Sequence, residues 1–293
     1  MKYNTEWKDY KIIATGGGMK LEKWGKFILL RPDPQIIWPE RTNLVEYKGL
    51  TAHYIRDNTG GGGWKFNKEM PDNFVVSWRN LRFYLKLMGF KHTGLFPEQA
   101  VNWSAVIALI KAAKRPVSVL NLFAYTGGAT VACLSAGASV CHVDAAKAMV
   151  DRAKENVALS GFSDGDARYI VDDCIKFVNR EIKRGRRYDA IIMDPPSFGR
   201  GPNNEVWKIE DNIYELVKLT RGVMSAEPLF HLINSYTTGL QPGVLKNIQR
   251  LIFGDYKNAE FDAYEVGLPT EEGIILPCGA SGLTVFHNLH VNA

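Results

Sequence analysis

Short apolar runs alternate with longer helical segments along the second two-thirds of the chain. The apolar runs are of strand length and lie at residues 117–123, 139–144, 167–171, 188–193 and 229–234. A segment of helical character follows each run, at 128–136, 146–160, 174–184, 207–224 and 243–253. Such strand-then-helix units predict an α/β fold, a doubly wound and mostly parallel sheet. Two last strand-like pieces, near 262–267 and 282–288, have no helix between them, so we expect an antiparallel edge and seven strands in all.

The first 90 residues have a different pattern, of short β segments broken by turns. We expect strands at 27–30 and 44–47, and a hairpin formed by 74–78 and 81–87. A glycine-rich turn is expected at 59–63. This pattern predicts a small β-rich domain.

The segment GFKHTG at 89–94 is the expected hinge between the two patterns. Pro97, soon after it, has the place of a first helical residue, and a helix is expected over 97–113. We therefore predict a β-rich N-terminal domain over 1–90 and an α/β domain over 91–293.

The overall composition is that of a globular protein, with 46% apolar and 23% charged residues. The sequence has no apolar run of membrane-spanning length, and its first residues lack the apolar core of a signal peptide. The four cysteines show no metal-ligand spacing; they are Cys133, Cys141, Cys174 and Cys278. We expect reduced thiols, no bound metal, no membrane association and a cytoplasmic location, with the oligomeric state left open.

Charge and tryptophan are both concentrated toward the N-terminus. Residues 1–115 contain 19 Lys/Arg against 10 Asp/Glu, whereas the remaining residues contain 17 against 21. Six of the seven tryptophans lie within the first 103 residues. Basic side chains interleaved with aromatic ones can hold phosphates and stack bases, which favours RNA as a partner. The alternatives are a solvated basic surface and aromatic residues that fill a small β core.

The turn after the first buried strand, NLFAYTGG at 121–128, is the first candidate site. A strand, a glycine turn and a helix place backbone N–H groups at the carboxyl end of the sheet, where nucleotide-like ligands bind. The turn lacks the third glycine of the dinucleotide fingerprint and the lysine of a phosphate-binding loop. It therefore suits a nucleotide-like ligand without a pyrophosphate.

Acidic residues follow the next two strands. Asp144 ends the second strand, where a carboxylate can accept both hydroxyls of a ribose. Asp172 and Asp173 follow the third strand, and Asp173 is the better candidate to hold an adenine amino group. The alternative for each acid is a helix N-cap, because a helical segment begins just after it.

The fourth strand ends in DPPSF at 194–198. Two consecutive prolines stiffen the backbone and remove donors, so the Asp194 carboxylate and the Pro195 carbonyl are both acceptors. Together they can hold an exocyclic amine, and Phe198 can stack on the ring that carries it. The alternative is a rigid structural turn.

These motifs, in this order and spacing, resemble those of the class I S-adenosylmethionine-dependent methyltransferases with a Rossmann-like sheet: NLFAYTGG, HVDA, VDDC and DPPSF. The chain is similar, more narrowly, to the bacterial 23S ribosomal RNA methyltransferase family, in which LNLFAYTG, DPPSF and a GLFPEQ-like segment recur. The last of these is TGLFPEQ at 93–99 here, and in such proteins it lies over the cofactor.

The resemblance implies S-adenosylmethionine as the methyl donor, S-adenosylhomocysteine as the product and ribosomal RNA as the substrate. The implied cofactor-binding residues are Phe96, Gln99, Asn121, Phe123, Ala124, Tyr125, Thr126, Gly127, Gly128, Asp144, Ala145, Asp172, Asp173 and Cys174. The implied catalytic residues are Asp194, Pro195, Pro196 and Phe198.

The chain departs from the family at the end of the fifth strand. Members that methylate carbon 5 of cytosine need a cysteine nucleophile there, but this chain has LFHLINSYTTG at 229–239, with Asn234, Ser235 and Tyr236. We therefore expect direct displacement at the methyl group by a base nitrogen. Cytosine methylation, with Cys278 as the remaining candidate nucleophile, is one alternative. The others are a protein amide or small-molecule substrate, a dehydrogenase, and a non-enzymatic RNA-binding protein with a degenerate site.

Overall fold

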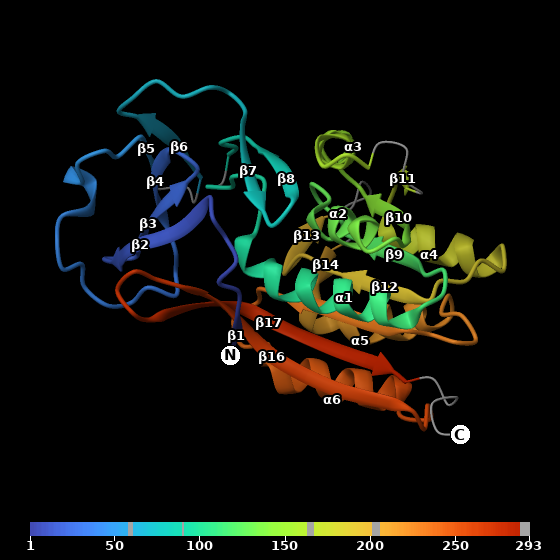
Figure 1. Cartoon of the computed structure of the whole chain (residues 1–293). Helices are drawn as coiled ribbons and strands as arrows, with labels where there is room; N and C mark the ends of the chain where they lie inside the picture. Colours follow the sequence, from blue (N-terminus) through green and yellow to red (C-terminus); the bar gives the residue numbers. More distant parts are fainter. Residues whose placement is uncertain (58–60, 90, 163–166, 201–205, 288–293) are drawn as a thin grey trace. The chain divides into compact units, whose positions relative to one another are not determined.

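The computed structural model describes residues 1–57, 61–89, 91–162, 167–200 and 206–287. It divides into two compact units (Figure 1). Unit 1 comprises Met1–Val101 with Gly267–Cys278, and unit 2 comprises Asn102–Val266 with Gly279–Ala293. The boundary between the units follows Val101, whereas the expected domain boundary follows residue 90. The functional division into 1–90 and 91–293 stays a prediction.

A large sheet organises unit 2; within the described residues it has eight strands, of which β1 belongs to unit 1. Their order is β1 (Lys2–Tyr3), β16 (Ala259–Pro269), β17 (Ile275–Phe286), β15 (Phe230–Ser235), β12 (Ala190–Met193), β9 (Ser118–Leu122), β10 (Ser139–Asp144) and β11 (Ala167–Val171). The pairs from β11 to β15 are parallel, and β17 is antiparallel to β15. The predicted doubly wound, mostly parallel fold with an antiparallel edge is confirmed. The eighth strand is the short β1, which the sequence pattern did not indicate.

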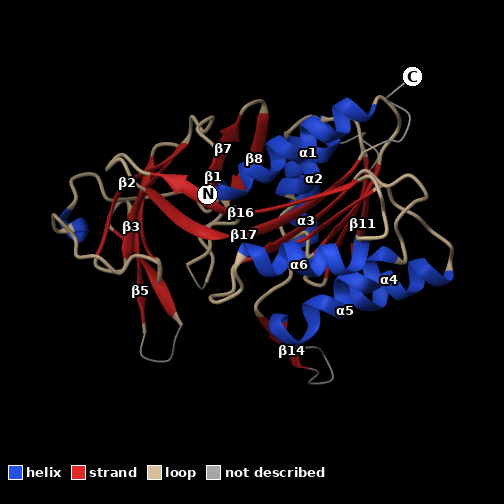
Figure 2. Cartoon of the chain, turned by 90° about the horizontal axis from the view of Figure 1, so that it is seen from below, coloured by secondary structure: helices blue, strands red, loops and turns tan. Residues whose placement is uncertain are grey.

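Helices cover both faces of this sheet (Figures 1 and 2). One face carries α1 (Ala100–Ala113), α2 (Gly128–Ser135) and α3 (Lys147–Leu159). The other carries α4 (Cys174–Lys183), α5 (Ile209–Arg221) and α6 (Pro242–Phe253). Strand alternation assigns side chains to the faces: Leu120 and Leu122 belong to the core beneath α4–α6, so Asn121 between them points to the α1–α3 face.

Two helix starts differ from the expected ones by more than one residue. The predicted helix 97–113 begins with a 3-10 turn, η2 (Pro97–Gln99), before α1. The predicted helix 207–224 begins later, at Ile209, because β13 (Phe198–Arg200) and β14 (Val206–Lys208) pair as an antiparallel hairpin. Within the described residues, no helix is both long enough and apolar enough to cross a membrane.

Unit 1 is β-rich, as predicted. Its described part contains a five-stranded sheet of β2 (Tyr10–Gly16), β3 (Met19–Trp24), β4 (Phe27–Pro32), β5 (Ala52–Arg56) and β6 (Gly62–Phe66). The predicted hairpin is present as β7 (Phe74–Trp78) and β8 (Leu81–Leu85). The glycine-rich turn lies partly outside the described residues, and its last two positions, Gly62 and Gly63, already belong to β6.

The strand predicted at 44–47 is wrong. Leu44–Glu46 forms a 3-10 helix, η1, because the Asn43 side chain accepts a hydrogen bond from Val45 N–H and caps the turn. Leu44 and Leu50 then pack against Leu21 and Leu30 of the sheet. An apolar run of four residues fits either structure, and the local cap decides between them.

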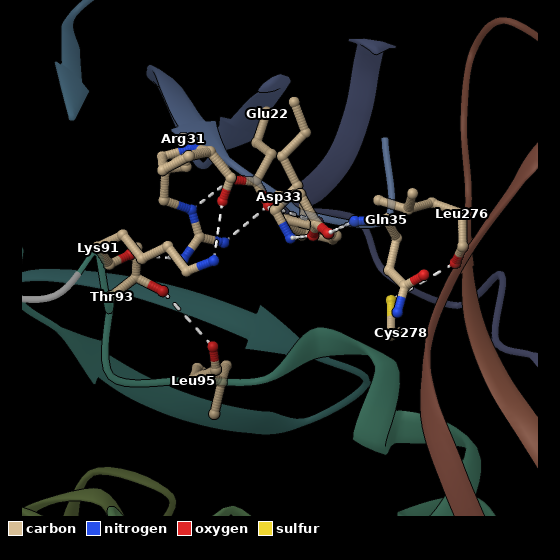
Figure 3. Close-up of polar contacts among 12 residues, drawn as sticks. Glu22, Arg31, Asp33, Gln35, Lys91, Thr93, Leu95, Leu276 and Cys278 are labelled. Atoms are coloured by element: carbon tan, nitrogen blue, oxygen red, sulfur yellow. Dashed lines mark hydrogen bonds and ion pairs between the residues drawn. The ribbon is translucent and has the colours of Figure 1, made fainter. Parts of the chain in front are cut away.

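A buried ionic cluster crosses the middle strands of unit 1 (Figure 3). Arg31 donates to both carboxylate oxygens of Glu22, at 2.5 and 2.8 Å, and the Tyr10 hydroxyl also donates to Glu22. Burial opposes the charged form of Glu22, but the charges of Arg31 and Lys20 and these hydrogen bonds outweigh it, so the pKa of Glu22 falls to about 2. Arg31 also donates to the carbonyl of Lys91, which ties the segment after β8 to β4.

Candidate active site

The carboxyl ends of four parallel strands lie at one level. Val143 of β10 is in register with Leu122 of β9, Leu122 with Met193 of β12, and Met193 with Ile233 of β15. The residues that follow these positions therefore start from the same edge of the sheet. This edge brings together the 121–128 turn, Asp144, the Asp194 turn and Asn234.

The backbone of the turn is unusual at three positions. Phe123 and Tyr125 have positive φ angles of 53° and 50°, and Gly127 has a φ of 83°. Non-glycine residues in this region cost free energy and are typical of functional turns. Ala124 N–H bonds to the Val143 carbonyl, which holds the turn against β10.

The two glycines are required by helix packing. A Cβ added at Gly127 would lie 2.8 Å from the Ala153 Cβ of α3, and one at Gly128 would lie 2.6 Å from the Trp103 ring of α1. Both distances are shorter than real Cβ contacts. The glycines thus let α2 start close to its neighbours, with its N-terminus at the edge of the sheet.

Asp144 is held by two backbone donors. Its Oδ2 accepts from Tyr125 N–H at 2.8 Å, and its Oδ1 accepts from Ala146 N–H at 2.9 Å. A carboxylate has about four lone-pair positions, so each oxygen keeps one for a further donor. The arrangement fits a ribose, whose two hydroxyls would each find one oxygen.

A buried polar network supports the turn from below. Asn121 donates to Thr130 Oγ1 at 3.0 Å, and Thr130 Oγ1 lies 2.9 Å from His142 Nδ1. Asn156 donates to the carbonyl of Thr126 at 2.8 Å. Burial lowers the pKa of His142 to about 4, so the network is neutral at pH 7. The side chain of Asn121 therefore acts within the protein, on α2.

The acidic pair after β11 has structural partners. Asp173 Oδ1 accepts from Lys176 N–H at 2.8 Å and caps α4, which is the alternative considered for this residue. Asp172 forms an ion pair with Arg180. The remaining oxygen of Asp173 stays the proposed acceptor for an adenine amine.

Cys174 lies beneath the turn rather than at its surface. The side chain is buried, and Phe123 N–H bonds to its sulfur at 3.3 Å. Burial raises the pKa of the Cys174 thiol, so it stays protonated. The thiol supports a strained residue of the turn.

Several hydrogen bonds fix the Asp194 turn. Trp207 Nε1 donates to the Pro196 carbonyl at 2.6 Å, and Thr237 donates to the Ser197 hydroxyl at 2.6 Å. Asp194 is half-buried and Pro195 is buried, whereas the Phe198 side chain is 54% exposed. An exposed aromatic ring is available for stacking on a base.

Trp207 is a site residue that the sequence reasoning missed. Its ring centroid lies 6.2 Å from that of Phe123, so it contacts the 121–128 turn as well as the Asp194 turn. It follows residues 201–205, which lie outside the described part, and β14 brings it back beside Phe198–Arg200. The signal available in the sequence was a single tryptophan just before a helix whose first turn contains Glu210 and Asp211.

Phe96 and Gln99 belong to unit 1. Phe96 is the N-cap residue of η2, and Gln99 is its last residue and is buried. Ala145, by contrast, is exposed directly after Asp144. Contact of any of these with a cofactor stays a prediction.

The cysteines do not supply a nucleophile at this edge. Burial raises the pKa of Cys133 to about 12 and also raises that of Cys278, so neither is a thiolate at pH 7. Cys278, the remaining candidate for cytosine methylation, belongs to unit 1, and its thiol donates to the Leu276 carbonyl. Among the described residues, no group of His, Cys, Asp and Glu could hold a metal ion.

The fold and this edge define a class I methyltransferase. Residues 50–240 match the family model of S-adenosylmethionine-dependent methyltransferases, so the chain belongs to that family. The predicted cofactor, S-adenosylmethionine, is thereby confirmed, and the dehydrogenase alternative is excluded. A methyltransferase from Agrobacterium tumefaciens has a similar structure, with a TM-score of 0.88, 30% identity and coverage of 96% of this chain and 92% of that one.

Curated relatives include ribosomal RNA large subunit methyltransferases. The enzyme K/L of Methylococcus capsulatus is 36% identical over 152 residues, which are 52% of this chain and 18% of that protein. The enzyme K of Neisseria meningitidis is 26% identical over 240 residues, which are 75% of this chain and 64% of that protein. The chain thus spans less than two-thirds of the length of these relatives.

Proposed function

We propose that this protein transfers a methyl group from S-adenosylmethionine to a nitrogen of a base in ribosomal RNA. The observation that carries the proposal is the shared edge, where the Asp144 carboxylate and the Asp194 turn start from β10 and β12, the two strands that flank β9. The Asp144 carboxylate is suited to the ribose of a nucleoside, and the Asp194 turn is suited to an amine. The curated relatives, which are ribosomal RNA methyltransferases, support RNA as the substrate.

The residues at the turn fit the cofactor. Each oxygen of Asp144 retains a lone pair for a ribose hydroxyl, and the strained backbone of Phe123 and Tyr125 shapes the turn beside it. Asp173 would hold the adenine amine. When bound, S-adenosylmethionine supplies a methyl group on a positively charged sulfur, which is already activated for displacement.

The Asp194 turn would hold the substrate. The Asp194 carboxylate and the Pro195 carbonyl would each accept a hydrogen bond from the amine, and Phe198 would stack on the base. Asp194 would accept the proton that the base nitrogen loses on methylation. Because the bond from Trp207 fixes the turn in advance, little reorganisation is required.

The N-terminal part is the proposed RNA-binding domain. Unit 1 has 16 Lys/Arg and 12 Asp/Glu, a smaller excess than that of residues 1–115. The difference arises because Glu271 and Glu272 belong to unit 1, whereas Lys111, Lys114 and Arg115 belong to unit 2. Arg31 and Lys20 are also paired internally. RNA contact would then depend on other Lys and Arg side chains at the surface of unit 1. A ribosomal RNA substrate would also imply that the protein acts in the cytoplasm.

Substrate labelling tests this function. The purified protein is incubated with radiolabelled S-adenosylmethionine and with separate RNA, ribosomal-subunit, protein and DNA fractions. We expect label in ribosomal RNA, at a base nitrogen. Label in protein alone would replace the RNA substrate by a protein amide, which the same Asp194 turn could hold.

The variant Asp194→Ala tests the site. We expect methyl transfer to fall at least about 100-fold, because the amine loses its charged acceptor. Affinity for S-adenosylhomocysteine, measured by calorimetry, should stay within about twofold of the wild type, because Asp194 is not among the proposed cofactor residues. Full activity of this variant would remove the central claim.

A further inference from the structure

Asn234, at the end of β15, lies in a buried network of side chains from four elements. Asn102 of α1 donates through Nδ2 to Asn234 Oδ1 and to Ser281 Oγ, both at 2.9 Å. Ser281 of β17 donates to Asn234 Oδ1 at 2.9 Å, and the Tyr264 hydroxyl of β16 donates to Asn102 Oδ1 at 2.8 Å. Asn234 is only 3% exposed.

The network determines which way the Asn234 amide faces. A phenol hydroxyl is a donor, so Asn102 turns its oxygen toward Tyr264 and its NH2 group toward Asn234. Asn234 must then present its oxygen to Asn102, and Ser281 donates to that same oxygen. The Asn234 NH2 group consequently points away from the network. Among the residues that the structure describes, none accepts a hydrogen bond from it.

Asp194 and Asn234 occupy neighbouring positions on one face of the sheet. Met193 and Ile233 are paired in register, and both belong to the core beneath α4–α6. The next residues, Asp194 and Asn234, therefore start on the opposite face, and the bond from Asn102 of α1 confirms this for Asn234. Adjacent strands are about 4.8 Å apart, so the Asp194 and Asn234 side chains leave the backbone from neighbouring positions at the strand ends.

We propose that Asn234 is a substrate-recognition residue, whose side-chain NH2 group donates to an acceptor on the base beside the amine held by Asp194. The inference rests on the proposed function and narrows its substrate. The Asp194 carboxylate and the Asn234 NH2 group together select a base edge on which an exocyclic amine lies next to a ring nitrogen that accepts a hydrogen bond. Adenine and cytosine present such an edge through their amine and the neighbouring ring nitrogen, and guanine does so through its 2-amine. Uracil, which lacks an amine, does not.

Two matched variants test this role. Asn234→Ala removes the donor and one partner of Asn102. Ser281→Ala removes a different partner of Asn102 but leaves the Asn234 donor in place. We expect Asn234→Ala to lower kcat/KM for the labelled substrate by about 10- to 100-fold, and Ser281→Ala to lower it by no more than about threefold. Both should bind S-adenosylhomocysteine as the wild type does. Equal losses in the two variants would show a structural role only and would overturn the proposal.

A binding experiment separates this proposal from the proposed function. The side-chain NH2 signals of Asn234 are identified in 15N spectra by their absence from Asn234→Ala. We expect them to shift when adenosine monophosphate is added to the protein saturated with S-adenosylhomocysteine, and not when uridine monophosphate is added. If the wild type labels no RNA, the proposed function fails while this titration still tests Asn234. No shift with adenosine, guanosine or cytidine monophosphate would overturn the inference.

Discussion

Gly127 offers a direct test of why the 121–128 turn contains glycine. Its φ of 83° is in the left-handed region, and an added Cβ would lie 2.8 Å from the Ala153 Cβ. The left-handed conformation costs an alanine about 1–2 kcal/mol, and an overpacked methyl group costs about 1–3 kcal/mol more. We expect Gly127→Ala to lower the free energy of unfolding by about 2–5 kcal/mol.

Gly137 is the matched control. It also has a left-handed φ, of 88°, but an added Cβ would find nothing within 4 Å. Gly137→Ala should therefore lose only the conformational contribution, about 1–2 kcal/mol. The difference between the variants isolates the packing of the turn against α3.

Urea unfolding of both variants measures this difference, provided that the slope with denaturant is unchanged. Calorimetric titration with S-adenosylhomocysteine adds a second readout. Gly127→Ala should bind S-adenosylhomocysteine more weakly, because a displaced turn also moves the Tyr125 N–H that donates a hydrogen bond to Asp144. Gly137→Ala should bind S-adenosylhomocysteine as the wild type does. Free energies of unfolding within about 0.5 kcal/mol of each other in the two variants would refute the packing argument.

Two further predictions concern Trp207 and Glu22. Trp207→Phe keeps an aromatic ring but loses the hydrogen bond to the Pro196 carbonyl. We expect kcat to fall about 10-fold, with KM for S-adenosylmethionine unchanged. Initial-rate measurements would show both. A parallel rise in that KM would instead assign Trp207 to cofactor binding. The folded pKa of Glu22, about 2, is below its ordinary value of 4.5, so its contribution to stability is present above pH 4.5 and is lost as the pH falls toward 2. Urea unfolding should show a flatter pH dependence of stability for Glu22→Gln across that window; an unchanged slope would contradict the assigned pKa.

Local pattern predicted much of the architecture. The predicted helix over 174–184 matches α4 to within a residue, because Asp173 caps its start and the apolar residues repeat at helical spacing. The failures occurred where the local signal was weak. The 44–47 run formed a capped 3-10 turn, and the β13–β14 hairpin was absorbed into the start of a predicted helix.

The candidate site divides in the same way. The parallel direction of the strands places the 121–128 turn, Asp144 and Asp194 at one edge, and it follows from the alternation of strands and helices. The order of the strands is seen only in the structure. The partners of each side chain do not follow from this pattern. Trp207 reaches the Pro196 carbonyl only because β14 returns beside β13, and Asn234 meets Asn102 across 132 positions of sequence.

The sequence by itself determined the class of fold, the family and the residues that share an edge, because these depend on periodicity and on motifs a few residues long. Only the tertiary structure decided what the residues at that edge do within the protein. It showed that Asp173 caps a helix and that the glycines of the turn make room for Ala153 and Trp103. It also oriented the Asn234 amide, because that direction is set by donors from strands and a helix far apart in the chain.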